Sequence, residues 1–532
     1  MQLSNKHYSL LIFPIISFIG GIWQGQYTDD GYHWGFIFSN ALDIINGKIP
    51  FKEIFIEYGI FSTVVHSLTL LIFKKNLLSL MFVTSLLYSL SIFLIGSITH
   101  KFTLNKYLGF LSTFIIFMIY PWPVAPWPNF ISFFFVILFC YFYVLESKKY
   151  NYLSGISLGL AYLSYTTVYN FIIFLFLLLS LIFIILNFKR IDKNFIKKNI
   201  NCINAFISTV SIFLIYLIYN NLLGVWLDYQ KIPFIMANAY DITILDKIND
   251  YIYFLFIYSF KNFIYEPQIL IYTFIFISNI YLISKIIYSY KKLTNNDLNL
   301  LIINFLILSL NIYAQLSDID KLGTSLSLGI VSLLILINSI KLNENKIIIN
   351  FIIIFVSIYS FVFAFGLENS KFGGSREAYY KNIKNRELTY KNKSISYFKS
   401  QKWHENSWHI LNSFISIQKK INSKCTIEYG VNLTSNAFMY VLMDYKKIQV
   451  IPFFYKAHNG AFRKNFDKNF IINMQNEINK NNILIISNKN NDKIVNLLNY
   501  APPKRINMVL KSNNIKRYIY VYFPKKCEVL DY

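Results

Sequence analysis

Apolar segments about as long as a bilayer is thick recur along the first 367 residues of this chain. The segment from Leu77 to Ile98 contains no charged residue, and about 20 apolar residues in a helix span the hydrocarbon core of a bilayer. The 532-residue chain is 55% hydrophobic and only 15% charged, which excludes a disordered, fibrous or disulfide-rich small protein and disfavours an ordinary soluble enzyme. We therefore predict an α-helical polytopic membrane protein.

The apolar segments predict eleven transmembrane helices. They are expected near residues 8–25, 77–99, 107–120, 129–146, 152–166, 169–188, 201–222, 268–288, 298–315, 324–340 and 347–366. The first has no small-residue cleavage site before Gln24, so we interpret it as an uncleaved anchor that starts in the cytoplasm.

Lysine-bearing connections support this orientation. With a cytoplasmic amino terminus, the connections 100–106, 147–151, 189–200, 289–297 and 341–346 all face the cytoplasm, and each carries two or more Lys or Arg residues. Such a bias is what the positive-inside rule predicts.

One further apolar segment, from Tyr58 to Phe73, contains His66 and is followed by Lys74 and Lys75. Counting it as a span would invert every later connection, so we interpret it as an interfacial or re-entrant helix, and Tyr251–Phe263 in the same way.

The composition changes after residue 367, so we divide the chain into a transmembrane domain, 1–367, and an external soluble α/β domain, 368–532. The second part has 28 Lys plus Arg against 11 Asp plus Glu, which accounts for 17 of the 24 net positive charges. Strands are expected at 426–429, 448–453, 483–486, 508–510 and 518–523. Cys140 and Cys202 are expected to be small hydrophobic residues inside helices, whereas Cys425 and Cys527 fall in the external domain and are candidates for a disulfide.

The net charge of +24 does not indicate nucleic-acid binding, because no binding motif accompanies it.

The acidic residues give more information about a possible active site than the net charge does. Asp29 and Asp30 stand in the sequence TDDGYHWG, where the first predicted span leaves the bilayer, and the first external loop, 25–76, continues with ALDIINGKIPFKEIFIEYG. Adjacent carboxylates repel, which separates their pKa values and can leave one as a base. A helix N-cap is the structural alternative for the pair.

These two sequence stretches resemble the first external loop of GT-C superfamily membrane glycosyltransferases that use polyprenyl-phosphate sugars, including the protein O-mannosyltransferase and aminoarabinose transferase families. The resemblance implies a GT-C-like fold, in which the first-loop acid is the catalytic base. That role is carried over to Asp29, with Asp30 as the alternative. It implies substrate binding by other residues of the loop, namely Tyr32, His33, Glu57 and Tyr58.

A second stretch, SDIDKL at 317–322, resembles a later external loop of these enzymes, although Leu316 and Lys321 replace the Arg and His expected there. Asp318, Asp320 and Lys321 are therefore candidates for substrate contact or simply cap a helix. A developing phosphate charge needs cations more than a general acid, and the candidates for binding it are Lys48, Lys52, Lys74, Lys75 and Lys321. Each is alternatively an interfacial lysine, which is the favoured interpretation for Lys74 and Lys75. Trp122 and Trp127 lie in a proline-rich connection and are candidates for stacking on a sugar, or for ordinary interfacial anchors.

We therefore expect an inverting glycosyltransferase of a bacterial inner membrane, acting on its external face. Its partners are the bilayer, a polyprenyl-phosphate sugar, and a glycan, lipid or protein acceptor. We expect no required cofactor, although Asp29 and Asp30 are compatible with a divalent cation. Trp403–His409 has the wrong His spacing for a zinc-protease helix. The alternatives are a flippase for a lipid-linked saccharide and a non-catalytic scaffold. No paired halves, which are typical of transporters, are evident.

Overall fold

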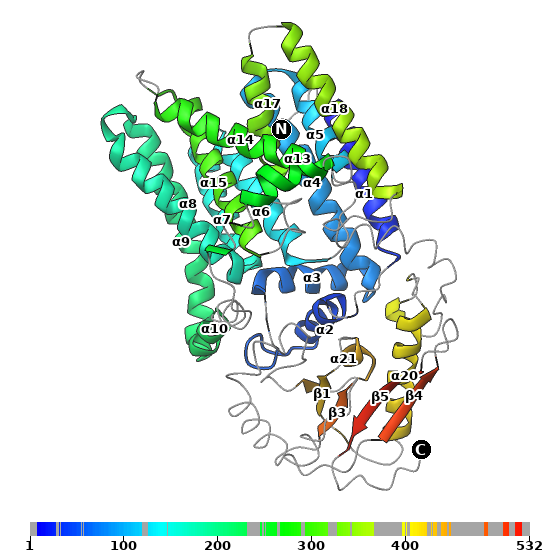
Figure 1. Cartoon of the computed structure of the whole chain (residues 1–532). Helices are drawn as coiled ribbons and strands as arrows, with labels where there is room; N and C mark the ends of the chain where they lie inside the picture. Colours follow the sequence, from blue (N-terminus) through cyan, green and yellow to red (C-terminus); the bar gives the residue numbers. More distant parts are fainter. Residues whose placement is uncertain are drawn as a thin grey trace.

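The computed structural model describes residues 8–27, 31, 33–54, 56, 58–119, 126–145, 147–230, 245–246, 249, 252–262, 267–288, 293–317, 327–340, 343–366, 396–398, 401, 405–422, 427, 429–433, 438–443, 446–447, 483–487, 504–509 and 516–523. Most of these residues form a helical bundle, and a small sheet lies beyond one end of it (Figure 1). The two regions are joined through short helices that belong to the first predicted external loop.

A helix occupies each of the eleven predicted spans. They are α1 (Ile12–Gln24), α4 (Leu77–Thr103), α5 (Lys106–Ile119), α6 (Pro128–Tyr143), α7 (Lys148–Ser164), α8 (Thr166–Leu186), α9 (Lys193–Tyr219), α14 (Pro267–Ile287), α15 (Asn295–Ser317), α17 (Ile330–Ser339) and α18 (Asn343–Gly366). Among the described residues, five helices are long and apolar enough to cross a membrane, namely α4, α8, α9, α14 and α15, whereas most of the others are apolar but shorter. The structure confirms the polytopic helical class.

The start of α9 differs from the prediction. We expected a span from residue 201 after a charged connection, but the helix begins at Lys193, where Asp192 is the N-cap and its side chain accepts from the Asn194 N–H. Lysines at helix surfaces extend their charged ends into water while their stems stay on the helix. The lysines between residues 193 and 198 are therefore compatible with the first turns of α9.

The segment that was ambiguous in the sequence forms α3 (Ile60–Phe73), which lies across the ends of the bundle helices rather than along them (Figure 1). The second such segment contains a π-helical turn, Tyr253–Tyr258, and α13 (Ser259–Asn262), both too short to cross a bilayer. The interpretation of both segments as interfacial or re-entrant remains a prediction. Two shorter helices lie on the same side as α3, namely α2 (His33–Ile45) and α10 (Leu223–Gln230).

Polar contacts inside the bundle join helices that are distant in sequence. The Asn279 amide of α14 donates to Asn304 Oδ1 of α15 at 2.6 Å, and Ser332 of α17 donates to the same oxygen at 2.8 Å. Such hydrogen bonds hold helices together where no hydrophobic effect acts between them. Cys140 and Cys202 are free and buried, as expected for small hydrophobic residues.

The carboxyl-terminal region forms a mixed five-stranded sheet in the order β2-β1-β3-β5-β4. Its strands are β1 (Tyr429–Leu433), β2 (Lys446–Lys447), β3 (Ile483–Ser487), β4 (Lys504–Val509) and β5 (Lys516–Tyr522), with helices α20 (Glu405–Asn422) and α21 (Met439–Leu442). β1 pairs in parallel with β3, and β5 is antiparallel to both β3 and β4. The predicted positions of two strands were wrong. β1 begins at Tyr429, where the predicted strand 426–429 was expected to end, and β4 begins four residues before the predicted strand 508–510. The expected strand at 448–453, Cys425 and Cys527 lie outside the described residues.

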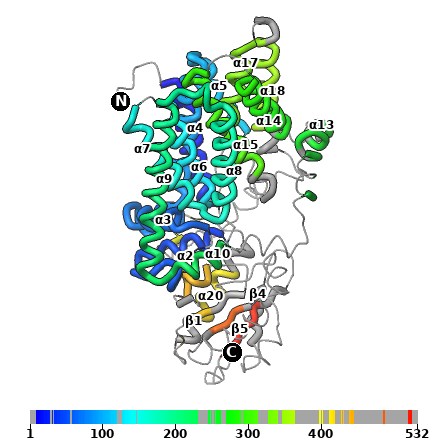
Figure 2. Tube along the Cα trace, turned by 90° about the vertical axis from the view of Figure 1, so that its left-hand side faces the viewer, coloured from blue at the N-terminus to red at the C-terminus, as the bar shows by residue number. Residues whose placement is uncertain are grey.

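Helix α2 lies between the bundle and the sheet (Figure 2). Every residue from Trp34 to Asp43 is buried, because one face packs on the bundle side and the other on the carboxyl-terminal region. Phe38, for instance, contacts the rings of Tyr397 and Phe398. The first loop and the carboxyl-terminal region therefore share one hydrophobic core.

Candidate functional site

The segment that carries the two candidate catalytic acids begins at a closely packed helix end. Helix α1 ends at Gln24, and a Cβ on Gly25 would lie 2.6 Å from Cβ of Met81, so only glycine allows α1 and α4 to approach so closely. The chain then turns, with the Tyr27 N–H donating to the Gln24 carbonyl at 2.9 Å. Tyr27 and Gly31 are both buried. The positions on either side of the acidic pair are thus anchored in the protein.

Asp29 and Asp30 themselves lie outside the described residues. Six candidate substrate-binding residues also lie outside the described residues, namely Tyr32, Glu57, Trp122, Asp318, Asp320 and Lys321. Helix α15 begins at Asn295, in the lysine-bearing connection 289–297, and ends at Ser317, immediately before Asp318. The roles of these residues remain predictions.

The structure brings His33 and Trp127 together, although they lie in different predicted loops. Their ring centroids are 5.3 Å apart, and both side chains are half-buried. The Trp127 indole Nε1 is buried, and within the described part of the chain no acceptor reaches it. Indole N–H groups usually have a partner when buried. This N–H is available to a polar group that enters beside His33.

His66 holds the same connection from the other side. Its Nε2 lies 2.9 Å from the carbonyl oxygen of Pro126, the residue before Trp127. Burial in α3, outside the spanning helices, lowers the pKa of His66 to about 4, while the hydrogen bond to Pro126 opposes that shift. The ring is therefore neutral at pH 7 and donates its Nε2 proton to the carbonyl. The sequence signal for His66 was a lone ionisable residue in an apolar helix.

The two candidate phosphate-binding lysines in the first loop have different environments. Lys48 forms an ion pair with Asp43 at 2.7 Å, and their side chains are 27% and 10% exposed. Lys52 is exposed in the following turn, which is held by a hydrogen bond from the Ile49 N–H to Glu53 Oε2 at 2.7 Å. The pairing with Asp43 reduces the positive field of Lys48, whereas Lys52 points its charge into solvent.

Tyr58, just before α3 in the first loop, packs against the junction of α7 and α8. Its ring meets that of Tyr165 edge to face at 5.4 Å, and its carbonyl accepts from the Thr166 hydroxyl at 3.1 Å. The sequence had not indicated Tyr165, which fell inside the predicted span 152–166, whereas in the structure it separates α7 from α8. Tyr58 contacts the junction of α7 and α8, and His33 contacts Trp127 just before α6, so the segment between them is held at both ends.

Among the described residues, no three His, Cys, Asp or Glu side chains are grouped to hold a metal ion. A divalent cation at Asp29 and Asp30 therefore stays a prediction.

Comparison with known proteins gives a result at the level of the fold. No family model matches the chain, and no curated protein matches it in sequence. Two solved structures are similar: ArnT from Cupriavidus metallidurans bound to undecaprenyl phosphate, with a TM-score of 0.53 at 10% identity, and the same protein in the apo state, with 0.51 at 9%. Each match covers 96% of this chain and 97% of ArnT.

The similarity therefore extends over nearly all of the chain. The chain has the fold of ArnT, which agrees with the fold that the first-loop resemblance implied.

Proposed function

We propose that this chain is an inverting membrane glycosyltransferase that moves a sugar from a polyprenyl-phosphate carrier to a glycan, lipid or protein acceptor on the external face of a bacterial inner membrane. The observation that carries the proposal is the fold similarity over 96% of the chain to a protein crystallised with undecaprenyl phosphate. Undecaprenyl phosphate is the molecule left behind when a sugar departs from its lipid carrier. A shared fold of this extent supports a shared class of donor.

In the proposed reaction, a carboxylate of Asp29 or Asp30 accepts the proton of an acceptor hydroxyl. The hydroxyl oxygen forms a bond with the anomeric carbon while the bond from that carbon to the phosphate oxygen breaks. The polyprenyl phosphate leaves with the electron pair, and the configuration of the anomeric carbon inverts. Since a phosphate is already a good leaving group, one base and some positive charge are sufficient.

The described loop residues support distinct roles in this scheme. We assign phosphate binding to Lys52, which is exposed, and loop positioning to Lys48, whose ammonium is held by Asp43. The Trp127 ring offers a face for sugar stacking, and its buried N–H offers a donor to a sugar hydroxyl. Tyr58, which packs against Tyr165, holds the first-loop segment just before α3.

The flippase alternative lacks comparable support. A carrier moves its substrate intact, and ionisable groups near mid-membrane are typical of it. The bundle contacts described above are neutral amides and hydroxyls, and the fold similarity is to a transferase.

The test supplies a panel of radiolabelled polyprenyl-phosphate sugars to the purified chain in nanodiscs and measures release of sugar from the carrier. We expect the wild type to consume at least one donor. Replacement of the residue that serves as base, by Asp29→Asn or Asp30→Asn, should lower the rate about 100-fold or more, which is the usual contribution of a general base.

Asp228→Asn is the matched control, since it removes one exposed carboxylate from α10 on the same side of the bundle. Its rate should stay close to wild type. Two results would contradict the proposal: no donor is cleaved by the wild type, or both loop variants fold normally and keep full activity. Movement of an intact donor across the membrane would favour the flippase instead.

A further inference from the structure

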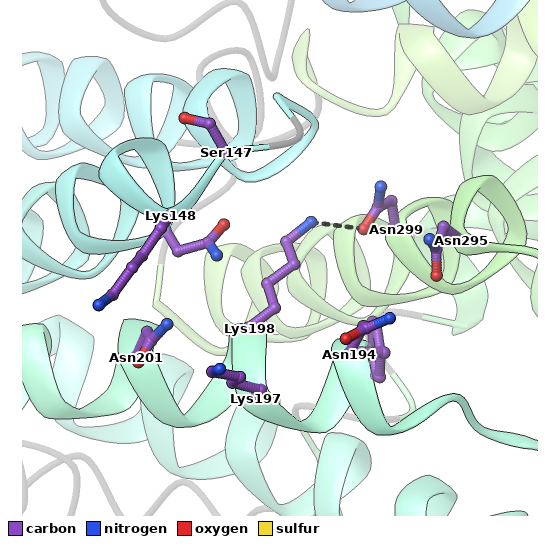
Figure 3. Close-up of a pocket in the computed structure, with 10 residues that line it drawn as sticks. Ser147, Lys148, Asn194, Lys197, Lys198, Asn201, Asn295 and Asn299 are labelled. Carbon is purple, nitrogen blue, oxygen red and sulfur yellow. Dashed lines mark hydrogen bonds between the residues drawn. The ribbon is translucent and has the colours of Figure 1, made fainter.

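A cavity of about 290 Å³ opens at the end of the bundle opposite α2 and α3. It is formed where the first turns of α7, α9 and α15 converge, three helices that are far apart in the sequence. Three lysines line it, Lys148 from α7 and Lys197 and Lys198 from α9, together with asparagines from all three helices (Figure 3). It is distinct from the proposed transferase site and takes no part in the proposed reaction.

The lining of this cavity is cationic. The described residues that line it include three ammonium groups and no carboxylate. Two described acids near it in sequence have hydrogen-bond partners: Asp192 accepts from Asn194 at the start of α9, and Asp297 accepts from the Thr294 N–H at 3.0 Å and its hydroxyl at 2.6 Å. Both carboxylates therefore serve as helix caps. Their charges lie beside the cavity but do not form part of its wall.

Lys198 is fixed in the cavity wall. Its ammonium donates to the Tyr143 carbonyl and, at 2.7 Å, to Asn299 Oδ1, and it lies 3.8 Å from the centroid of the Tyr143 ring. Figure 3 shows this side chain crossing from α9 to α15. The acceptors named here are uncharged, and they position the ammonium in the cavity wall. Asn299 is only 2% exposed, which makes the contact part of the core.

Backbone polarity adds to the positive charge. The amino-terminal ends of α7, α9 and α15 meet at the cavity, and each carries the positive end of a helix dipole. Asparagine side chains around the wall supply further N–H donors. A phosphate group, with its negative charge and several acceptor oxygens, matches this combination of ammonium, amide and helix ends.

We propose that this cavity binds a phosphate group at the Lys-rich ends of the helices. The phosphate belongs either to the headgroup of an anionic phospholipid in the adjacent leaflet or to a soluble phosphate compound. Lys148 and Lys197, which are exposed, receive it, and Lys198 forms the fixed inner contact. Binding would link α7, α9 and α15 and so stabilise the bundle.

The test uses the full-length chain in nanodiscs of phosphatidylcholine alone or with a tenth of phosphatidylglycerol, and measures bound lipid by native mass spectrometry and the thermal unfolding midpoint. Inorganic phosphate is added in a separate arm. Wild type should retain phosphatidylglycerol or be stabilised by inorganic phosphate, and the arm that responds identifies the source. Lys148→Gln combined with Lys197→Gln should weaken the binding about tenfold or more, because each lysine near a membrane surface contributes substantially to anion attraction.

Lys149→Gln is the matched control, since it removes a charge from the same helical turn, is exposed and does not line the cavity. It should bind within about twofold of wild type. The double variant involves only exposed side chains, so folding is expected to survive even if a Lys198→Gln variant does not fold. The proposal is overturned if neither probe binds, if the double variant binds like wild type, or if Lys149→Gln weakens binding equally.

Discussion

A methyl group at Gly59 should displace the first loop from the bundle. Gly59 precedes α3 and follows Tyr58, and its φ of −174° is ordinary extended backbone that alanine also adopts. A Cβ there would lie 2.5 Å from the Leu163 carbonyl oxygen and from the backbone of Ser164, at the end of α7. These are backbone atoms, which cannot rotate out of the way. The effect of Gly59→Ala is therefore steric alone.

The magnitude follows from that distance. Ordinary contact begins at 3.4 Å, so the loop must move by about 0.9 Å from the 2.5 Å approach. Overpacking of this kind costs about 1–3 kcal/mol of folding free energy, which for a large domain lowers the unfolding midpoint by about 2–5 °C. A misplacement near 1 Å in groups that position a substrate can cost about 100-fold in rate. We expect the transfer rate of Gly59→Ala to fall between about 10- and 100-fold.

Thermal unfolding and sugar transfer are measured on the same nanodisc preparation. Gly224→Ala is the control, because a Cβ on Gly224 in α10 meets nothing within 4 Å. That variant should match wild type in both measurements. If Gly59→Ala unfolds and transfers like wild type, the close approach of α3 to α7 is refuted. If it is less stable but transfers normally, the loop does not depend on this contact for its geometry.

Four further outcomes are expected. Gly155→Ala places a Cβ 2.0 Å from the Cys202 carbonyl oxygen, so α7 and α9 must separate, and the yield of monodisperse protein by size-exclusion chromatography should fall sharply. Asn304→Ala leaves two buried donors without their acceptor and should cost about 1–2 kcal/mol in a chemical unfolding titration. The pKa of His66 in the folded protein is about 4, below its ordinary value of 6.5, so the unfolded protein binds more protons than the folded protein between these pH values. The free energy of unfolding should therefore decline as the pH falls from 6.5 toward 4, and it should decline less in His66→Gln. Trp127→Phe removes the buried N–H and should raise KM several-fold in donor titrations with little change in the unfolding midpoint.

Hydropathy predicted the helices well because the constraint that a bilayer places on a spanning segment depends only on the residues of that segment. Backbone polar groups in hydrocarbon must be satisfied within the segment, so a long apolar run forms a helix whatever its neighbours are. The ends of the helices were less predictable. Lys193 to Lys198 suggested a connection, yet Asp192 caps a helix there, and capping depends on one side chain rather than on the average polarity of the segment.

Helix α2 shows what a local pattern omits. Its sequence, from His33 to Ile45, is amphipathic, which predicts one face in water. In the structure, Asn40 and Asp43 are also buried, because α21 and the carboxyl-terminal region pack on the remaining face. That partner lies hundreds of residues away in the chain, so no pattern within the helix could reveal it.

The sequence by itself determined the membrane class, the approximate spans and the acidic segment after the first helix, because each follows from residues close together in the chain. Only the tertiary structure decided which of those residues meet. It joined His33 to Trp127 and His66 to Pro126, and it gathered three lysines around one cavity. Periodicity determines which face of a helix is apolar, whereas the identity of its neighbour depends on how all the faces pack together.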